Sequence, residues 1–209
     1  MVLIAKPPPK YAPDPTFYIL AQGSHIIRVF DPTQYATQAL TFRSFGPIHR
    51  FDHHYLNNKG EPQENSHRRI YYAGLTLSSC IVEIFGDTRL IEIKDQCIAY
   101  PYLTRDLKLL DLRKNGAMKA GSVAALAKTS DRNLSQEWSC YFYETVTNYG
   151  EIDGIFYGNA HNDEDAIALY ERAQNSLECP DNKIINLNHP ALRPHIQAIA
   201  KDNHLIISQ

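Results

Sequence analysis

The apolar residues of this chain fall into short runs that are separated by polar segments rich in Gly, Pro, Asn and Asp. Such runs are typical of β-strands, which in globular proteins span only a few residues between turns. The pattern predicts strands over residues 17–20, 25–30, 70–74, 89–93, 97–103, 107–112, 154–160, 165–172, 184–187 and 205–208.

Helical spacing of apolar side chains predicts helices over residues 76–87, 115–128, 134–149 and 189–202. In the first of them, Thr76 or Ser78 is the expected N-cap and Gly86 the expected end. Strands and helices do not alternate strictly along the chain, which favours an α+β fold over a doubly wound parallel sheet.

Two segments lack a periodic pattern. Residues 6–15 contain five prolines, so we expect an extended arm over residues 1–16 that lies on the surface or on a neighbouring molecule. A single domain over residues 17–209 would follow it. Residues 31–69 are irregular, and a loop of this length inside a compact domain is usually functional. We therefore expect the binding or active site there.

Composition and charge exclude several classes of function. With 21 Lys and Arg against 23 Asp and Glu in 209 residues, the formal net charge is −2. A nearly neutral chain lacks the positive surface that general binding to nucleic acid or to a membrane requires. No apolar stretch is long enough for a signal peptide or a membrane span, so we expect a cytoplasmic location. The four widely spaced cysteines are expected to be reduced.

Two arginines are candidates for anion binding. Arg28 falls within a predicted strand and Arg50 within the irregular loop. Guanidinium groups bind phosphate or carboxylate in a bidentate manner, so the pair could clamp an anionic ligand. The alternative is that both are surface arginines paired with nearby carboxylates. Glycine-rich nucleotide loops are missing from the sequence, so any nucleotide must be held by side chains.

Glu83 is a carboxylate within the otherwise apolar stretch CIVEIF. On a helix, such a residue lies at the edge of the buried face or points into a cleft. In a cleft it could bind a ribose hydroxyl or stabilise an oxocarbenium ion. The alternative is an ordinary solvent-facing helix residue. The aromatic residues Tyr141, Phe142, Tyr143 and Tyr149 are expected to pack in the core.

The loop also carries His49, Asp52, His53 and His54, whose side chains are of the types that ligate zinc or iron. The alternative is a polar loop whose side chains pair with other protein groups. The spacing lacks a helical i, i+4 histidine pair with a catalytic glutamate, so we expect no metal.

The order of these motifs resembles the RES domain, a family named for an Arg, a Glu and a Ser. The segment HIIRVFDP is similar to the family's opening strand with its Arg, here Arg28, and IHRFDHH supplies Arg50. The most specific part is YYAGLTLSSCIVEIF, in which Glu83 follows Tyr72 by eleven positions. In EIDGIFYGNA, Asn159 stands where the family has Ser. The resemblance covers residues 25 to 175.

The resemblance implies an ADP-ribosyltransferase-like single domain, with a central mixed and antiparallel β-sheet core split into two sheets and flanking helices. It also implies NAD as substrate, cleaved at the nicotinamide–ribose bond, and no metal. Arg28 and Arg50 would hold the pyrophosphate, and Tyr72 would orient the nicotinamide. Glu83 would stabilise the charge on the ribose, and Asn159 would bind near the nicotinamide.

Family members of this kind are toxins of bacterial toxin–antitoxin modules, so the resemblance also implies an antitoxin partner. Two other activities stay open: transfer of ADP-ribose to a protein, and NAD binding without catalysis because Asn159 replaces the serine. Tyr71 and Tyr157 are further candidates for the site. A homo-oligomer assembled through the proline-rich arm is left open as well.

Overall fold

The computed structural model describes residues 2–208 and is built around a five-stranded sheet in the order β1-β9-β10-β11-β5. Only the β9–β10 pair is parallel, and the other neighbours are antiparallel. In chain order these strands are β1 (Phe17–Leu20), β5 (Ile70–Gly74), β9 (Leu107–Asp111), β10 (Gly154–Gly158) and β11 (Asp165–Tyr170).

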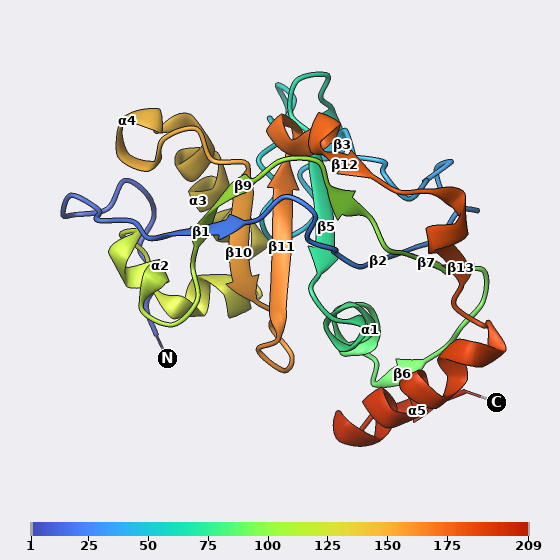
Figure 1. Cartoon of the computed structure of the whole chain (residues 1–209). Helices are drawn as coiled ribbons and strands as arrows, with labels where there is room; N and C mark the ends of the chain where they lie inside the picture. The colour runs from blue at the N-terminus through green and yellow to red at the C-terminus, as the bar shows by residue number, and fades with distance from the viewer. Residues whose placement is uncertain (1, 209) are drawn as a thin grey trace.

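A second, three-stranded antiparallel sheet continues from the edge of the first. Its order is β13 (Ile184–Asn186), β7 (Cys97–Ala99) and β2 (Arg28–Phe30). The two sheets meet where Ile27 and Gly74 exchange backbone hydrogen bonds of 2.9 and 2.8 Å. This junction lies at the end of β5, directly beside the start of the first long helix (Figure 1).

Three two-stranded pairs complete the β-structure of the described residues. They are β3 (Phe45–Gly46) with β4 (Gln63–Glu64), β12 (Leu177–Glu178) with β8 (Tyr102–Leu103), and β14 (Ile206–Ile207) with β6 (Leu90–Ile91). The helices are α1 (Leu77–Phe85), α2 (Gly116–Lys119), α3 (Arg132–Glu144), α4 (Val146–Tyr149) and α5 (Arg193–Asp202). Four 3₁₀ turns lie between them: η1 (Ala124–Lys128), η2 (Glu171–Ser176), η3 (Asp181–Lys183) and η4 (Pro190–Leu192).

Three apolar clusters hold these layers together. Trp138 and Phe142 of α3 pack on one face of the main sheet, where Ile155 is buried. A second cluster fills the other face of this sheet, and a third joins α1 to α5, in which Ile81 contributes from α1 and Ile196 from α5. Figure 1 accordingly shows α2, α3 and α4 on one side of the sheet, with α1 and α5 gathered at the other end.

The predicted α+β fold with two main sheets is confirmed, and the differences from the sequence prediction have local causes. The expected strand over residues 97–103 is divided between β7 and β8 because Pro101 cannot donate a ladder hydrogen bond. The expected helix over residues 115–128 is divided into α2 and η1 at Gly121, whose φ is +86°.

The helix expected over residues 134–149 begins earlier, at Arg132, because the side chain of Asp131 accepts a hydrogen bond of 3.1 Å from the amide of Leu134. It ends at Glu144, and a separate short helix follows. Of the two N-cap candidates for α1, Thr76 and Ser78, the structure selects Thr76, since its side chain accepts from the amide of Ser79 at 2.9 Å.

The proline-rich arm lies on its own domain. Ile4 packs against the core cluster under α3, and the indole N–H of Trp138 donates to the carbonyl of Ala5 at 2.8 Å. Farther along, the amide of Asp14 donates to the carbonyl of Lys119 in α2 at 2.9 Å. The arm therefore runs beside α2 and α3 before it enters β1, as the blue segment of Figure 1 shows.

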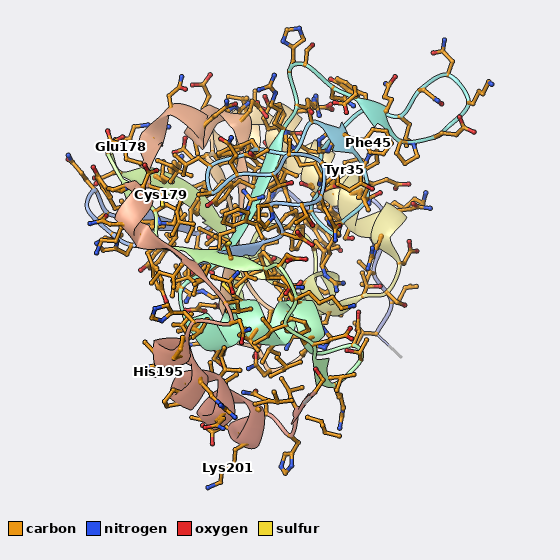
Figure 2. All side chains as sticks on the ribbon, turned by 90° about the vertical axis from the view of Figure 1, so that its right-hand side faces the viewer. Tyr35, Phe45, Glu178, Cys179, His195 and Lys201 are labelled. Atoms are coloured by element: carbon orange, nitrogen blue, oxygen red, sulfur yellow. The ribbon has the colours of Figure 1, made fainter. Side chains whose placement is uncertain are left out.

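The long loop and the C-terminal helix occupy different ends of the molecule. Figure 2 shows Tyr35 and Phe45 of the loop far from His195 and Lys201, which project from α5. No helix within residues 2–208 is long and apolar enough to cross a membrane.

Candidate functional site

A pocket opens at the junction of the two sheets, between β2, β5 and α1. It brings together three of the residues predicted from sequence: Arg28, Tyr72 and Glu83. The remaining lining residues are Val29, Ala73, Gly74, Ser79, Cys80, Ile84, Tyr157 and Ala166. Residues from four separate parts of the chain therefore converge on one small cavity.

Arg28 lies on β2, and its guanidinium stacks 4.4 Å from the ring centroid of Tyr71. Its Nη1 donates a hydrogen bond of 2.6 Å to the carbonyl of Thr41 in the long loop. Burial lowers the pKa of the guanidinium, which still stays charged at neutral pH. Within residues 2–208 no carboxylate forms an ion pair with Arg28. Its positive charge is therefore left for a ligand, and Tyr71 serves as its support.

Arg50 stands one residue before Phe51, which is fully buried and packs with its ring centroid 4.8 Å from that of Tyr157. The guanidinium donates to the carbonyl of Thr129 ahead of α3. It does not line the pocket, but it lies close enough to Glu83 to favour the ionised form of that carboxylate. Within the described residues it too is free of an ion pair with any carboxylate.

Glu83 lies in the second turn of α1 and lines the pocket. The side chain of Glu83 is exposed to solvent at the pocket, although protein atoms surround its carboxyl group. The loss of water around the carboxyl raises the pKa of Glu83, and the nearby Arg50 and His161 oppose the rise. Gly86 fits this arrangement, because a Cβ there would lie 2.7 Å from the ring of His161.

Tyr72 lines the pocket, and its hydroxyl is engaged in two hydrogen bonds. The hydroxyl donates to Oδ1 of Asp52 at 2.9 Å and accepts from the amide of Phe51 at 3.0 Å. Burial and the neighbouring carboxylate raise its pKa far above the ordinary value, so it stays neutral. The ring of His49 meets it edge-on, with 5.7 Å between the two centroids.

Asn159 lies outside the pocket lining, and its amide is committed to the turn between β10 and β11. Its Oδ1 accepts from the amides of His161 and Asn162, each at 3.0 Å, and its Nδ2 donates to the side chain of Asn162 at 2.8 Å. The side chain is fully buried. Asn159 therefore holds the turn that carries His161 to the neighbourhood of Glu83.

Two histidines of the loop have hydrogen-bond partners within the protein. His53 lies 2.9 Å from a carboxylate oxygen of Glu171, and His54 lies 3.1 Å from the carbonyl oxygen of Arg43. Asp52 binds Arg43 through both oxygens, at 2.7 and 2.6 Å. Among residues 2–208 no group of three or more His, Cys, Asp or Glu side chains is placed to hold a metal ion.

Sequence reasoning missed that buried Asp52 pairs with the half-buried Arg43 and accepts a hydrogen bond from Tyr72. Their signal in the sequence was ambiguous, since an Asp among histidines suggests a metal as readily as a support. Of the two further tyrosines considered, Tyr157 lines the pocket and Tyr71 lies beneath Arg28. The four aromatic residues expected in the core all lie in or against the cluster under α3.

Comparisons with known proteins bear on the family and the fold. The sequence profile of the RES domain matches residues 25–191. A solved structure titled "Crystal structure of the M.tuberculosis MbcT-MbcA toxin-antitoxin complex" contains a similar chain, with a TM-score of 0.56 and 14% sequence identity. The similarity covers 86% of this chain and 92% of that chain, and at this identity it shows the fold alone. No curated protein matches the sequence.

Proposed function

Because the chain belongs to the RES domain family, we propose that it cleaves the nicotinamide–ribose bond of NAD and depletes NAD as a toxin. The observation that carries the proposal is the convergence of Arg28, Tyr72 and Glu83 on one pocket, with Arg28 unpaired by any carboxylate of residues 2–208. A cationic group, an aromatic face and a carboxylate match the three parts of NAD: pyrophosphate, nicotinamide and ribose.

Each residue has a distinct task in this reaction. Arg28 attracts the negatively charged pyrophosphate, and Arg50 adds a second positive charge on the side of Glu83. The face of Tyr72 packs on the cationic nicotinamide ring. The bond between the ribose C1′ and the nicotinamide nitrogen breaks, and its electron pair leaves with neutral nicotinamide. Glu83 stabilises the positive charge that develops on the ribose until water or phosphate attacks C1′.

A partner and a location follow from the same proposal. The similar chain of known structure comes from a toxin–antitoxin complex, which supports an antitoxin protein as the partner of this chain. An antitoxin segment that covers the pocket would exclude NAD. The substrate pool that such a toxin would consume favours the cytoplasm as its place of action.

The test is whether the purified protein consumes NAD, with and without phosphate. The release of nicotinamide is the quantity measured. We expect Glu83→Gln to lower the rate by about 100-fold or more, because one preorganised electrostatic contact to a transition state contributes that much. The matched control is Glu92→Gln, which changes an exposed glutamate paired only with Lys94 and should keep full activity.

Other outcomes identify the alternatives. If label from NAD appears on a polypeptide, the protein is an ADP-ribosyltransferase. If NAD raises the melting temperature but stays intact at high protein concentration, the chain is a binding module without catalysis. If NAD neither binds nor disappears, the proposed function is wrong.

A further inference from the structure

Asp52 is a fully buried carboxylate that lies behind the pocket without lining it. It accepts hydrogen bonds from Nη2 of Arg43 at 2.7 and 2.6 Å, from the amide of Ile48 at 2.5 Å and from the amide of His49 at 2.9 Å. The hydroxyl of Tyr72 donates a further bond of 2.9 Å. An ionised carboxylate tolerates burial only with such a full set of partners.

These bonds tie the irregular loop to the edge strand of the main sheet at two points. Arg43 pairs with Ile70 of β5 through backbone hydrogen bonds of 2.8 and 3.1 Å. Asp52 binds Tyr72, which lies two positions farther along β5 and therefore on the same face of the strand. The carboxylate thus fixes the distance between the loop and the strand.

Two residues of the proposed NAD site depend on this arrangement. The hydroxyl of Tyr72 spends its donor on Asp52 and one acceptor position on the amide of Phe51, so the ring cannot turn freely. Arg50 lies within the turn from Ile48 to Asp52, whose first two amides the carboxylate holds.

We propose that Asp52 is a positioning residue that sets the ring of Tyr72 and the loop of Arg50 for NAD. It acts through these two residues and does not touch the substrate. The inference rests on the proposed function and adds to it a residue that has no direct place in the chemistry. The hydrogen-bond partners of Asp52 are all donors, from Arg43, the amides of Ile48 and His49, and Tyr72.

Asp153 provides a matched control for a purely structural loss. It too is a buried carboxylate, bound by Arg105 through two hydrogen bonds of 3.0 and 2.6 Å and by the amide of Lys108 at 2.8 Å. It lies outside the pocket lining. Asp153→Asn should therefore lower stability much as Asp52→Asn does, with kinetics unchanged for the folded protein.

The kinetic test uses Asp52→Asn, Tyr72→Phe and the double variant with NAD as the probe. We expect Asp52→Asn to raise KM by about tenfold or more, with a smaller change in kcat, because misplaced binding groups weaken substrate binding first. If Asp52 acts through Tyr72, the double variant should be no worse than Asp52→Asn alone. Fully additive effects, or a KM equal to that of the unaltered protein, would overturn the inference.

A second measurement is independent of NAD. With tyrosine labelled by ¹³C at Cζ, the signal of Tyr72 is the one of 13 tyrosine signals that disappears in Tyr72→Phe. We expect Asp52→Asn to shift and broaden this signal, and Asp153→Asn to leave it in place. An unmoved signal contradicts the inference whatever the kinetics show. If the signal moves but the unaltered protein neither binds nor consumes NAD, the proposed function fails and Asp52 positions Tyr72 for another purpose.

Discussion

At the scale of single residues, the pocket is defined by which side chains have spare hydrogen-bonding capacity. Arg28 gives one bond to Thr41 and keeps its charge unpaired, so it can still bind an anion. The amide of Asn159 has spent both its oxygen and one N–H on the turn that follows β10. Its role in the structure is therefore to hold this turn, which carries His161.

The role of Asn159 can be measured as stability. Asn159→Ala removes three hydrogen bonds and leaves the amides of His161 and Asn162 without this acceptor, so we expect a loss of about 2–3 kcal/mol in the free energy of unfolding. Urea denaturation measures this loss. Asn159→Asp keeps the accepting oxygen and should lose less. If Asn159 contacts NAD directly instead, the alanine variant would raise KM with little change in stability.

At the scale of elements, short segments are stabilised by contacts that lie far away in the sequence. The arm before β1 has neither helix nor strand over residues 2–16, yet it covers α3 through Ile4 and the Trp138–Ala5 hydrogen bond. The arm therefore contributes to the core, although its proline-rich sequence is typical of a linker. We expect it to contribute to the stability of the domain.

Removal of residues 1–12 should therefore destabilise the protein by about 1–3 kcal/mol, chiefly through lost apolar burial and the lost Trp138–Ala5 hydrogen bond. Trp138 is the only tryptophan of the chain, so its fluorescence should shift to longer wavelength as it meets water. Because the arm packs on its own domain, we expect the truncated protein to elute from gel filtration as the full chain does.

A single substitution separates packing from charge in the arm. Lys6→Ala breaks only an exposed ion pair with Glu137, and such pairs contribute little to stability. The melting temperature should hardly change. A large drop, or a change of oligomeric state on truncation, would show that the arm acts in another way.

At the scale of the whole molecule, buried polar contacts make the long loop part of the folded core. His53 pairs with Glu171 after β11, and the guanidinium of Arg68 donates to the carbonyl of His53 at 2.9 Å and to Glu144 of α3 at 2.7 Å. The burial that these contacts require lowers the pKa of His49, of His53 and of His54. Folding is thereby coupled to pH.

Stability should fall as the pH drops from 6.5 toward 4. Burial lowers the pKa of His53 from 6.5 to about 4, so within this window the unfolded chain binds a proton that the folded protein does not. The free energy of unfolding then rises with pH, and His53 alone accounts for about 2–3 kcal/mol of the change. Urea denaturation at a series of pH values between about 4.5 and 7.5 measures how steeply the free energy of unfolding changes with pH.

Two variants show which histidine causes the change of the unfolding free energy with pH. His53→Gln should reduce it, because glutamine can still donate to Glu171 but does not titrate. His67→Gln changes an exposed histidine of the same loop and should leave the slope as it is. An unchanged slope in His53→Gln would assign the pH dependence to other groups.

The sequence by itself determined the α+β class, the position of β1 and β5, the start of α1 to within two residues and the order of motifs that identifies the family. These features depend on periodicity, local capping and spacing, all of which act between residues close together in the chain. The eleven-residue separation of Tyr72 and Glu83 belongs to this class, because two consecutive elements, β5 and α1, carry it.

Only the tertiary structure decided which polar side chains are already partnered. Asp52 accepts a hydrogen bond from Tyr72, which lies on another element. It also accepts one from the amide of His49, only three residues earlier, so that the turn between them closes on a buried charge. Nothing in the local pattern separates such a support from a metal ligand. The reason is physical: whether a side chain can still bind a ligand depends on its burial and on the hydrogen bonds it already makes. Long-range packing sets both.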